Sequence, residues 1–365
     1  MTVAIAGLLA LGAGVLPLRA EEGTKDWGYD KGLFFKTDGF EMKVGARLQF
    51  RLTNTDPEGA DPTREFRIRR AKFFGSGWAY KPWIKYKFQF NAVGNTTVTD
   101  LTGSTTKGFD LEDFYVDFAK NGMATVRVGQ YKVPFGMQEL TSSGSQQFVD
   151  RSIASETFAP GRDQGVVLMG DFVGQKLGYE AGFFNGNGRN QSSNDNNKFE
   201  YVARVHFDPR GHYKLEESAT GNPDRLLWTI GAGWLQNATD AAGDLKQDSV
   251  EGFFALMYRR VSVIADYYRK SADQMGGGTL DSNGSIGQVG VFLIPKTLEV
   301  ALRSSRVDPD TDTSDDTTTE SRFAINWFIK AHHLKLQTDF GRITQQTVPG
   351  DVHTDEARAQ LQIIF

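Results

Sequence analysis

Cysteine is absent from this chain of 365 residues, which excludes disulfide bonds and metal sites built on thiolates. An excess of positive charge is also lacking, because 41 lysines and arginines face 45 aspartates and glutamates. This balance argues against a nucleic-acid partner. The sequence contains no Gly-x-Ser-x-Gly motif, and its five histidines show no spacing that suggests a nucleophile with its base. We therefore expect neither an enzyme nor a site for a cofactor or a metal.

Long apolar runs are lacking too, apart from residues 1–20. This run is short for a spanning helix, and it ends at Ala20 before two glutamates. We interpret residues 1–20 as a secretory signal peptide. Because no other segment suggests a membrane helix, any membrane span in the mature chain has to consist of strands.

Strict alternation is what the sequence has in abundance. In residues 40–52, FEMKVGARLQFRL, every second residue is apolar, and the residues between are polar, charged or glycine. A period of two predicts a strand with one apolar face and one wet face. The segment is longer than most globular strands and long enough to cross a bilayer at a tilt.

Sixteen such segments follow one another within residues 39–365, and an even number is typical of bacterial outer-membrane barrels. We predict strands near residues 40–52, 63–77, 82–92, 109–119, 124–134, 164–173, 176–186, 198–208, 225–236, 248–259, 260–270, 284–294, 297–306, 319–330, 333–343 and 354–365. The predicted fold class is all-β, a sixteen-stranded antiparallel transmembrane β-barrel. A soluble β-sandwich is the alternative, but the charged faces leave no second apolar layer for its core.

The predicted connections alternate between tight turns and long polar loops. Short turns on one rim and long loops on the other are typical of outer-membrane barrels, whose short turns face the periplasm. Residues 21–38 are then a periplasmic lead-in to the barrel. The connection 209–224 should be a short turn and is long. We interpret it as an insertion.

The third long loop, residues 135–163, differs from the others in composition. It follows Pro134, which cannot donate to a sheet ladder and should end the preceding strand. Its apolar residues Leu140, Phe148, Ile153 and Phe158 require burial. Because long ordered loops are usually functional, we expect this loop to fold into the barrel and form a constriction.

The predicted wet faces of the strands carry more basic than acidic side chains, although the chain as a whole is slightly acidic. The basic set is Arg47, Arg51, Lys85, Lys87, Arg127, Arg204, Arg303, Lys335 and Arg358, and the acidic set is Glu41, Asp113, Asp117, Glu200, Glu251, Glu299 and Asp339. Basic side chains at a constriction favour anions over cations. The alternative is a wall of paired charges with little net field.

The region around the third loop resembles a known family. The motifs are VGQYKVPFG at 128–136, Thr141-Ser142-Ser143, Asp150-Arg151 and Arg67-Ile68-Arg69-Arg70-Ala71. Together they are similar to the phosphate-selective porins of the O/P family, and the likeness extends over the mature chain. This resemblance implies homotrimers of sixteen-stranded barrels in which an inward-folded third extracellular loop makes the narrowest point.

The resemblance also implies a set of anion-binding residues. In strongly phosphate-selective members, the loop supplies two lysines, an arginine and serines, and the second strand supplies an arginine pair. By position, Arg69, Arg70, Ser142, Ser143 and Arg151 match, whereas Glu139 and Gly144 stand at the lysine positions. We therefore expect a weakened phosphate site with these constriction residues: Arg69, Arg70, Arg127, Glu139, Ser142, Ser143 and Arg151.

These patterns lead to one functional hypothesis. The chain is predicted to be a porin of the Gram-negative outer membrane that lets small hydrophilic solutes diffuse passively, with a preference for anions such as phosphate. Its expected partners are small anionic or polar solutes, membrane lipid and two further copies of itself. A non-selective general porin, and a structural or receptor barrel that holds a partner in its lumen, remain as alternatives. A barrel enzyme of the outer membrane is a third alternative, which the absence of a nucleophile with its base disfavours.

Overall fold

The computed structural model describes residues 26–29, 32–93, 97–99, 105–107 and 109–365. The predicted signal peptide, residues 1–20, lies outside the described residues. Sixteen strands form the barrel: β3 (Phe40–Pro57), β4 (Thr63–Ala79), β5 (Lys81–Asn91), β8 (Asp110–Asn121), β9 (Ala124–Lys132), β10 (Arg162–Phe172), β11 (Leu177–Phe184), β12 (Glu200–Phe207), β13 (Leu227–Ala238), β14 (Lys246–Tyr258), β15 (Val261–Asp273), β16 (Thr279–Ile294), β17 (Leu298–Asp308), β18 (Thr318–Lys330), β19 (Leu334–Gln345) and β20 (Val352–Ile364).

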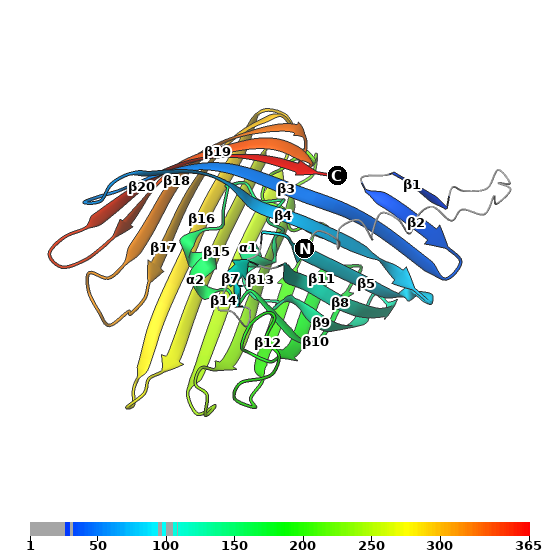
Figure 1. Cartoon of the computed structure of the whole chain (residues 1–365), viewed down its shortest axis with the longest axis horizontal. Helices are drawn as coiled ribbons and strands as arrows, with labels where there is room; N and C mark the ends of the chain where they lie inside the picture. The colour runs from blue at the N-terminus through cyan, green and yellow to red at the C-terminus, as the bar shows by residue number, and fades with distance from the viewer. Residues whose placement is uncertain (1–25, 30–31, 94–96, 100–104, 108) are drawn as a thin grey trace.

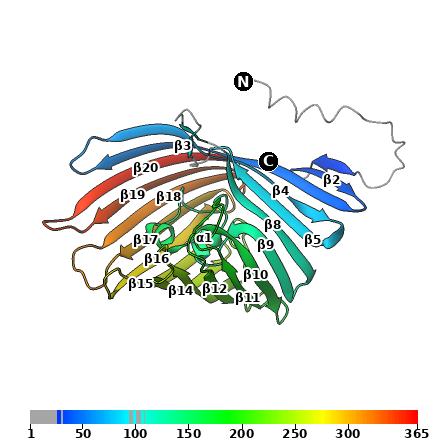
Figure 2. The ribbon, with the colours of Figure 1, turned by 60° about the horizontal axis from the view of Figure 1, so that its bottom comes forward.

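Each barrel strand pairs antiparallel with its neighbours, and the last strand pairs with the first (Figures 1 and 2). At this closure Leu361 of β20 lies opposite Phe50 of β3. Closure leaves no unpaired edge, which is what a sheet in a bilayer requires. All sixteen strands lie where the alternation predicted them, and the predicted barrel is confirmed.

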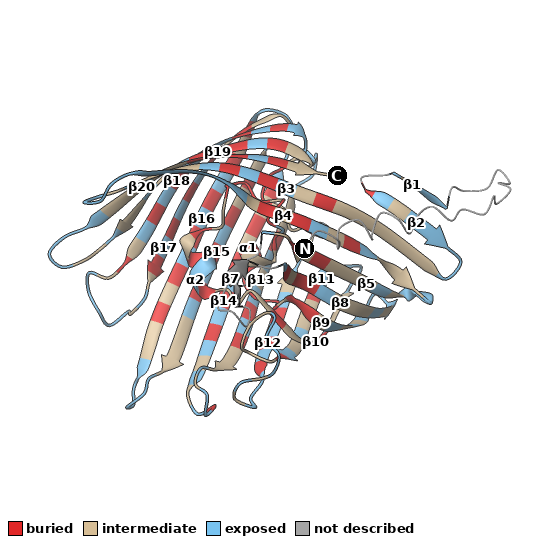
Figure 3. Cartoon of the chain, in the orientation of Figure 1, coloured by how far each residue is buried: buried red, intermediate tan, exposed pale blue. Residues whose placement is uncertain are grey.

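The two faces of the barrel wall differ as the alternation predicted, with buried and exposed residues striping each strand (Figure 3). Phe50 is 43% exposed on the outer face, whereas its neighbour Arg51 is 1% exposed on the inner face. The apolar side chains that would be a core in a soluble protein therefore point outward. This inversion is the arrangement that lipid demands of a membrane barrel.

Irregularities in the wall also follow the sequence. The pairing of β3 with β4 shifts by one residue, so that Gln49 lies opposite Arg70 and Phe50 lies opposite Ile68. Arg69 is thus the extra residue of a β-bulge, at the place where the alternation slips. A bulge re-aims side chains, and here the neighbours Arg69 and Arg70 both turn towards the lumen.

The segment before the barrel forms two short strands, β1 (Trp27–Tyr29) and β2 (Leu33–Thr37). β1 pairs with β2, and β2 pairs with the first residues of β3, where Leu33 lies opposite Val44. A further small hairpin joins β6 (Thr97–Thr99) to β7 (Thr105–Lys107). Within the described residues, no helix is long and apolar enough to cross a membrane.

Two non-strand segments occupy the interior of the barrel. The first is the loop between β9 and β10, which contains the short helices α1 (Met137–Leu140) and α2 (Ile153–Phe158) and is enclosed by strands in Figure 2. The second is the connection 208–226 between β12 and β13, in which Glu217, Ser218 and Ala219 are all at most 1% exposed. Both segments shape the space through which a solute would pass.

Candidate functional site

The loop between β9 and β10 enters the barrel because its apolar residues pack against one side of the wall. Phe158 stacks on Tyr268 of β15 with ring centroids 5.6 Å apart, and Phe135 lies 6.1 Å from the same ring. Phe135 and Phe148 are each at most 1% exposed, so the apolar residues of the loop find the burial that they require. The aromatic contacts hold both ends of the loop near β15.

Polar contacts fix the loop to the same side. Glu251 of β14 accepts hydrogen bonds from the N–H groups of Gly136 and Met137 at 2.8 and 2.5 Å, at the start of α1. Asp339 of β19 accepts from the N–H of Val149 at 3.0 Å. The loop thus covers the wall from β14 to β19, and the open space lies on the opposite side, along β4 to β12.

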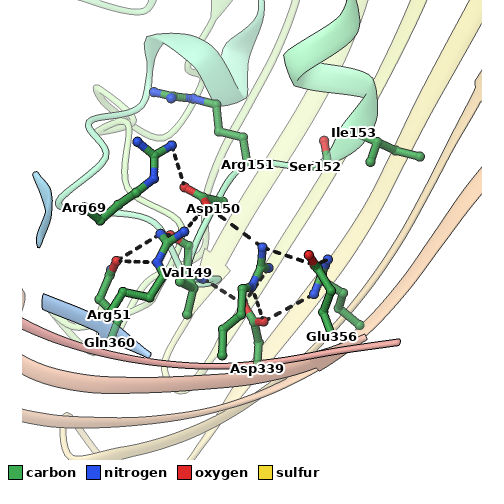
Figure 4. A network of polar contacts seen from close by, with 12 residues as sticks. Arg51, Arg69, Val149, Asp150, Arg151, Ser152, Ile153, Asp339, Glu356 and Gln360 are labelled. Carbon is green, nitrogen blue, oxygen red and sulfur yellow. Dashed lines mark hydrogen bonds and ion pairs between the residues drawn. The ribbon is translucent and has the colours of Figure 1, made fainter. Parts of the chain in front are cut away.

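Asp150 forms the centre of a charge network that ties the loop to β3 and β4 (Figure 4). Its carboxylate is bonded to the buried Arg51, and it accepts longer bonds of 3.4 Å from Arg69 and Arg70. Burial raises the pKa of Asp150, but the guanidiniums of Arg51 and Arg70 outweigh burial and hold the pKa well below its usual range. Arg358 of β20 lies 4.0 Å from the same carboxylate, so four arginines surround Asp150 and leave a surplus of positive charge at this carboxylate.

Arg151 and Glu139 form an ion pair within the loop, with 2.8 Å between Nε and Oε2. Lys132 lies 3.8 Å from the other carboxylate oxygen of Glu139. Burial raises the pKa of Glu139, yet Lys132 and Arg151 outweigh burial and lower it. Arg151 also donates to the carbonyls of Gln138, Glu139 and Thr141 at the end of α1. Arg151 therefore braces the loop, and its charge is offset by Glu139.

Arg47 of β3 meets the two loop serines. Its guanidinium donates to Ser143 Oγ at 3.0 Å and to Ser142 Oγ at 3.2 Å. Its Nε is buried and has no hydrogen-bond partner among the described residues. No ion pair of Arg47 occurs in the described part of the chain. A Cβ at Gly144 would lie 2.7 Å from Arg47 Cζ, so the space that a side chain at 144 would fill holds this guanidinium.

Arg127, the remaining predicted site residue, stands apart from this group. It makes two hydrogen bonds to Asp117, at 2.7 and 2.9 Å, and its guanidinium lies 3.9 Å from the centre of the Tyr115 ring. Among the residues that the structure describes, no hydrogen bond or ion pair joins Arg127 to the loop. Of the seven predicted residues, the structure therefore groups six around the loop and leaves Arg127 on the wall.

A cavity of about 1400 Å³ separates the loop from the wall formed by β4 to β12. Fourteen lysines and arginines line it, against eight aspartates and glutamates, counted over the described residues: Arg47, Arg67, Arg69, Arg70, Lys72, Lys85, Lys87, Lys120, Arg127, Lys132, Arg151, Arg162, Arg189 and Arg204, against Glu65, Asp110, Glu112, Asp113, Asp117, Glu139, Asp171 and Glu180. The cavity thus carries an excess of six positive charges in a chain whose formal net charge is −4.

The connection 208–226 reaches this loop from the rim of short turns. Glu217 donates its N–H to the carbonyl of Ser145 at 3.1 Å and accepts the N–H of Gln147 at 2.8 Å. Ser218 donates to Glu299 of β17 at 2.9 Å. The sequence marks this segment only as an insertion. In the structure it supports the loop from the side of the short turns, and it fills the half of the lumen that the loop also occupies.

Sequence reasoning missed two contributors to the site. Arg47 was predicted to face the lumen, but the sequence does not indicate that it would meet Ser142 and Ser143, nearly a hundred residues away. For the connection 208–226, the signal in the sequence is a length that is unusual for a turn on this rim.

Comparison with known proteins places these observations in a family. A family model described as phosphate-selective porin O and P matches residues 40–365. No curated protein sequence matches the chain. Solved structures that resemble it include OmpT, an outer-membrane protein of Vibrio cholerae (10% identity, TM-score 0.61, covering 91% of this chain and 99% of that one).

Two further solved structures are similar to the same extent. An anion-selective porin from Comamonas acidovorans has 10% identity and a TM-score of 0.61, covering 89% of this chain and 99% of that one. The outer-membrane channel DcaP of Acinetobacter baumannii has 11% identity and a TM-score of 0.60, covering 91% and 99%. At such identities the likeness concerns the fold.

Proposed function

This chain belongs to the phosphate-selective porin O and P family, and on that premise we propose that it is a passive outer-membrane pore that favours small anions. Porins of the bacterial outer membrane are channels rather than enzymes, and the barrel has the inverted polarity that this location requires. The anion preference rests on one observation above all. The cavity lining carries an excess of six positive charges although the whole chain is slightly acidic.

The pairing of the charges in the cavity lining supports anion passage further, beyond their excess of six. Many basic side chains are paired, such as Lys72 with Glu112 at 2.5 Å and Arg162 with Asp113 at 2.7 Å. Within the described residues, Arg47, Lys85 and Lys120 line the cavity without an ion pair. Unpaired cations beside paired ones create a positive field along the path without trapping an anion at every step.

We propose an oxyanion-binding position at Arg47, Ser142 and Ser143. The predicted residues Arg69 and Arg70 line the same cavity and add positive charge to it. Guanidinium and hydroxyl groups are the donors that phosphate oxygens accept from. The unpartnered Nε of Arg47 offers one further donor. The side chain of Arg47 stands in the space at Gly144, and it supports an anion site there in place of the lysine that the family resemblance implies.

Recording single channels in a planar bilayer under a KCl gradient tests the proposal. We expect a reversal potential closer to the equilibrium potential of chloride than to that of potassium. We also expect added phosphate to reduce the conductance. Conductance without ion selectivity would identify a general porin and overturn the proposed preference. A barrel that conducts nothing and copurifies with a partner would instead support a structural or receptor role.

Replacing Arg47 by alanine should shift the reversal potential towards cations and weaken the block by phosphate roughly tenfold or more, since the site loses a charge-assisted pair of donors. The matched control is Arg342→Ala, which removes the same charge at an exposed pair with Asp355 outside the cavity lining. Equal behaviour of the two variants would exclude Arg47 from the anion path.

Replacing Arg151 by alanine should also shift the selectivity towards cations, because the carboxylate of Glu139 loses its partner at 2.8 Å. Adding Glu139→Ala to this variant should restore most of the wild-type reversal potential, since the pair is then removed as a whole. The double variant is the control. A double variant as cation-selective as Arg151→Ala would mean that Arg151 acts on the ions directly rather than through Glu139.

We further propose that the pore assembles as a homotrimer with its outer face in lipid. The family resemblance implies trimers, and the OmpT of Vibrio cholerae has a trimer form. Light scattering of the purified protein in detergent, corrected for bound detergent, would measure the mass of the assembly and distinguish one chain from three.

A further inference from the structure

Three side chains that could ligate a metal ion converge at the rim of short turns. They are Asp171 near the end of β10, His206 near the end of β12, and His212 in the connection 208–226. One ligand atom of each lies within 4.8 Å of those of the other two. All three residues line the cavity between the loop and the wall. The sequence predicted no metal site, because the residues come from three separate elements.

The barrel register explains why Asp171 and His206 meet. Asp171 lies opposite Gly178 of β11, and Gly178 lies opposite His206. Asp171, Gly178 and His206 therefore form a row across three neighbouring strands, with the glycine in the middle. A Cβ at Gly178 would lie 2.0 Å from Cε1 of His206, so the imidazole occupies the space that glycine leaves free. The absent side chain lets the aspartate and the histidine reach one another.

Asp208 completes the surroundings of the two histidines. Its Oδ2 lies 3.5 Å from Nδ1 of His212 and 3.9 Å from Nε2 of His206, and it accepts the N–H of Tyr213 at 2.7 Å. The Oδ1 of Asp208 and the Nδ1 of His206 are buried and have no hydrogen-bond partner in the described part of the protein. Buried polar atoms are rarely left unpaired, and two in one cluster point to a missing ligand.

We propose that Asp171, His206 and His212 bind a divalent transition-metal cation such as Zn²⁺, with Asp208 as a supporting carboxylate. Two imidazoles with a carboxylate form a donor set that suits zinc. Magnesium and calcium prefer sites made of oxygen ligands and fit this set poorly. The nearby Arg204 does not oppose a cation strongly, because it is paired with Glu180 at 3.0 Å.

Binding at this site would have a structural consequence. His212 belongs to the connection 208–226, whereas Asp171 and His206 belong to the barrel wall. A bound cation would therefore fasten the connection to two strands. Because the connection supports the loop through Glu217, the metal would stabilise the arrangement that narrows the lumen.

Equilibrium dialysis of the folded protein in detergent against buffered Zn²⁺ tests the proposal. One Zn²⁺ per chain is the expected result, with no displacement by excess Mg²⁺. His206→Ala and His212→Ala should each weaken binding by roughly tenfold or more. His353→Ala is the matched control, because it removes a histidine far along the chain and should leave the affinity unchanged.

Gly178→Ala provides a second variant that keeps every proposed ligand. Its methyl group would collide with the imidazole of His206 and should reduce Zn²⁺ affinity as much as loss of the histidine. Because His212 is exposed, His212→Ala should fold normally, and loss of binding in that variant cannot be attributed to misfolding. Absence of Zn²⁺ binding in the wild type, or binding that survives both histidine substitutions, would overturn the proposal.

Discussion

Replacing residues 214–222 by a short glycine–serine turn should raise the single-channel conductance severalfold. These residues lie in the connection 208–226, which fills the lumen beneath the loop and bonds to it through Glu217. Glu217 and Ser218 are at most 1% exposed, so their removal empties space inside the barrel. The loop also loses both hydrogen bonds that Glu217 makes to it, at Ser145 and Gln147, and should become more mobile, because fewer contacts then hold it in place. Planar-bilayer recording measures both effects, as a larger current and as greater current noise.

The control for this replacement is a shortened turn at Gly276–Gly278, which lies between β15 and β16 outside the cavity lining. That variant should conduct like the wild type. Glu217→Ala provides a milder test, since it removes only the carboxylate that accepts from Gln147 and from the amides of Gln138 and Gln288. An unchanged conductance after replacement of 214–222 would show that the connection does not obstruct the path.

Asp150→Asn should lower the free energy of unfolding by about 3–5 kcal/mol, the usual cost of removing one partner from a buried ion pair. The carboxylate of Asp150 is shared by four arginines, of which Arg51 is 1% exposed: Arg51, Arg69, Arg70 and, at 4.0 Å, Arg358. Without the carboxylate, Arg51 keeps only neutral partners, Gln360 and the carbonyl of Val149. Urea-induced unfolding in micelles, followed by circular dichroism, measures the loss.

Asp355→Asn is the matched control for this prediction. Asp355 accepts two bonds of 2.7 Å from Arg342, but both side chains are more than half exposed, and exposed pairs contribute little to stability. The free energy of unfolding of the control should therefore stay close to that of the wild type. The same Asp150→Asn protein should also become more anion-selective, because the loop loses a negative charge beside four arginines. An equal stability of both variants would mean that the network at Asp150 does not hold the loop.

The alternation of side chains by itself determined the fold of this protein. A period of two is a local property of the backbone, and a wall between lipid and water imposes it on every strand, so sixteen strands could be located from the sequence. The slip at Arg69 marked a bulge because the same period fails there. Pro134 marked the end of β9, and the apolar residues of the following loop indicated that it would need burial.

The tertiary structure alone decided which charges act and which are neutralised. Arg151, which the resemblance implied as an anion-binding residue, is paired with Glu139. Arg47 reaches Ser142 and Ser143 and has no ion pair among the residues that the structure describes. The metal-binding row depends on Gly178 lying between Asp171 and His206. Such contacts join residues far apart in the chain, and only barrel closure and strand register bring them together. The sequence pattern defines the face on which a side chain lies, but the register decides what it meets there.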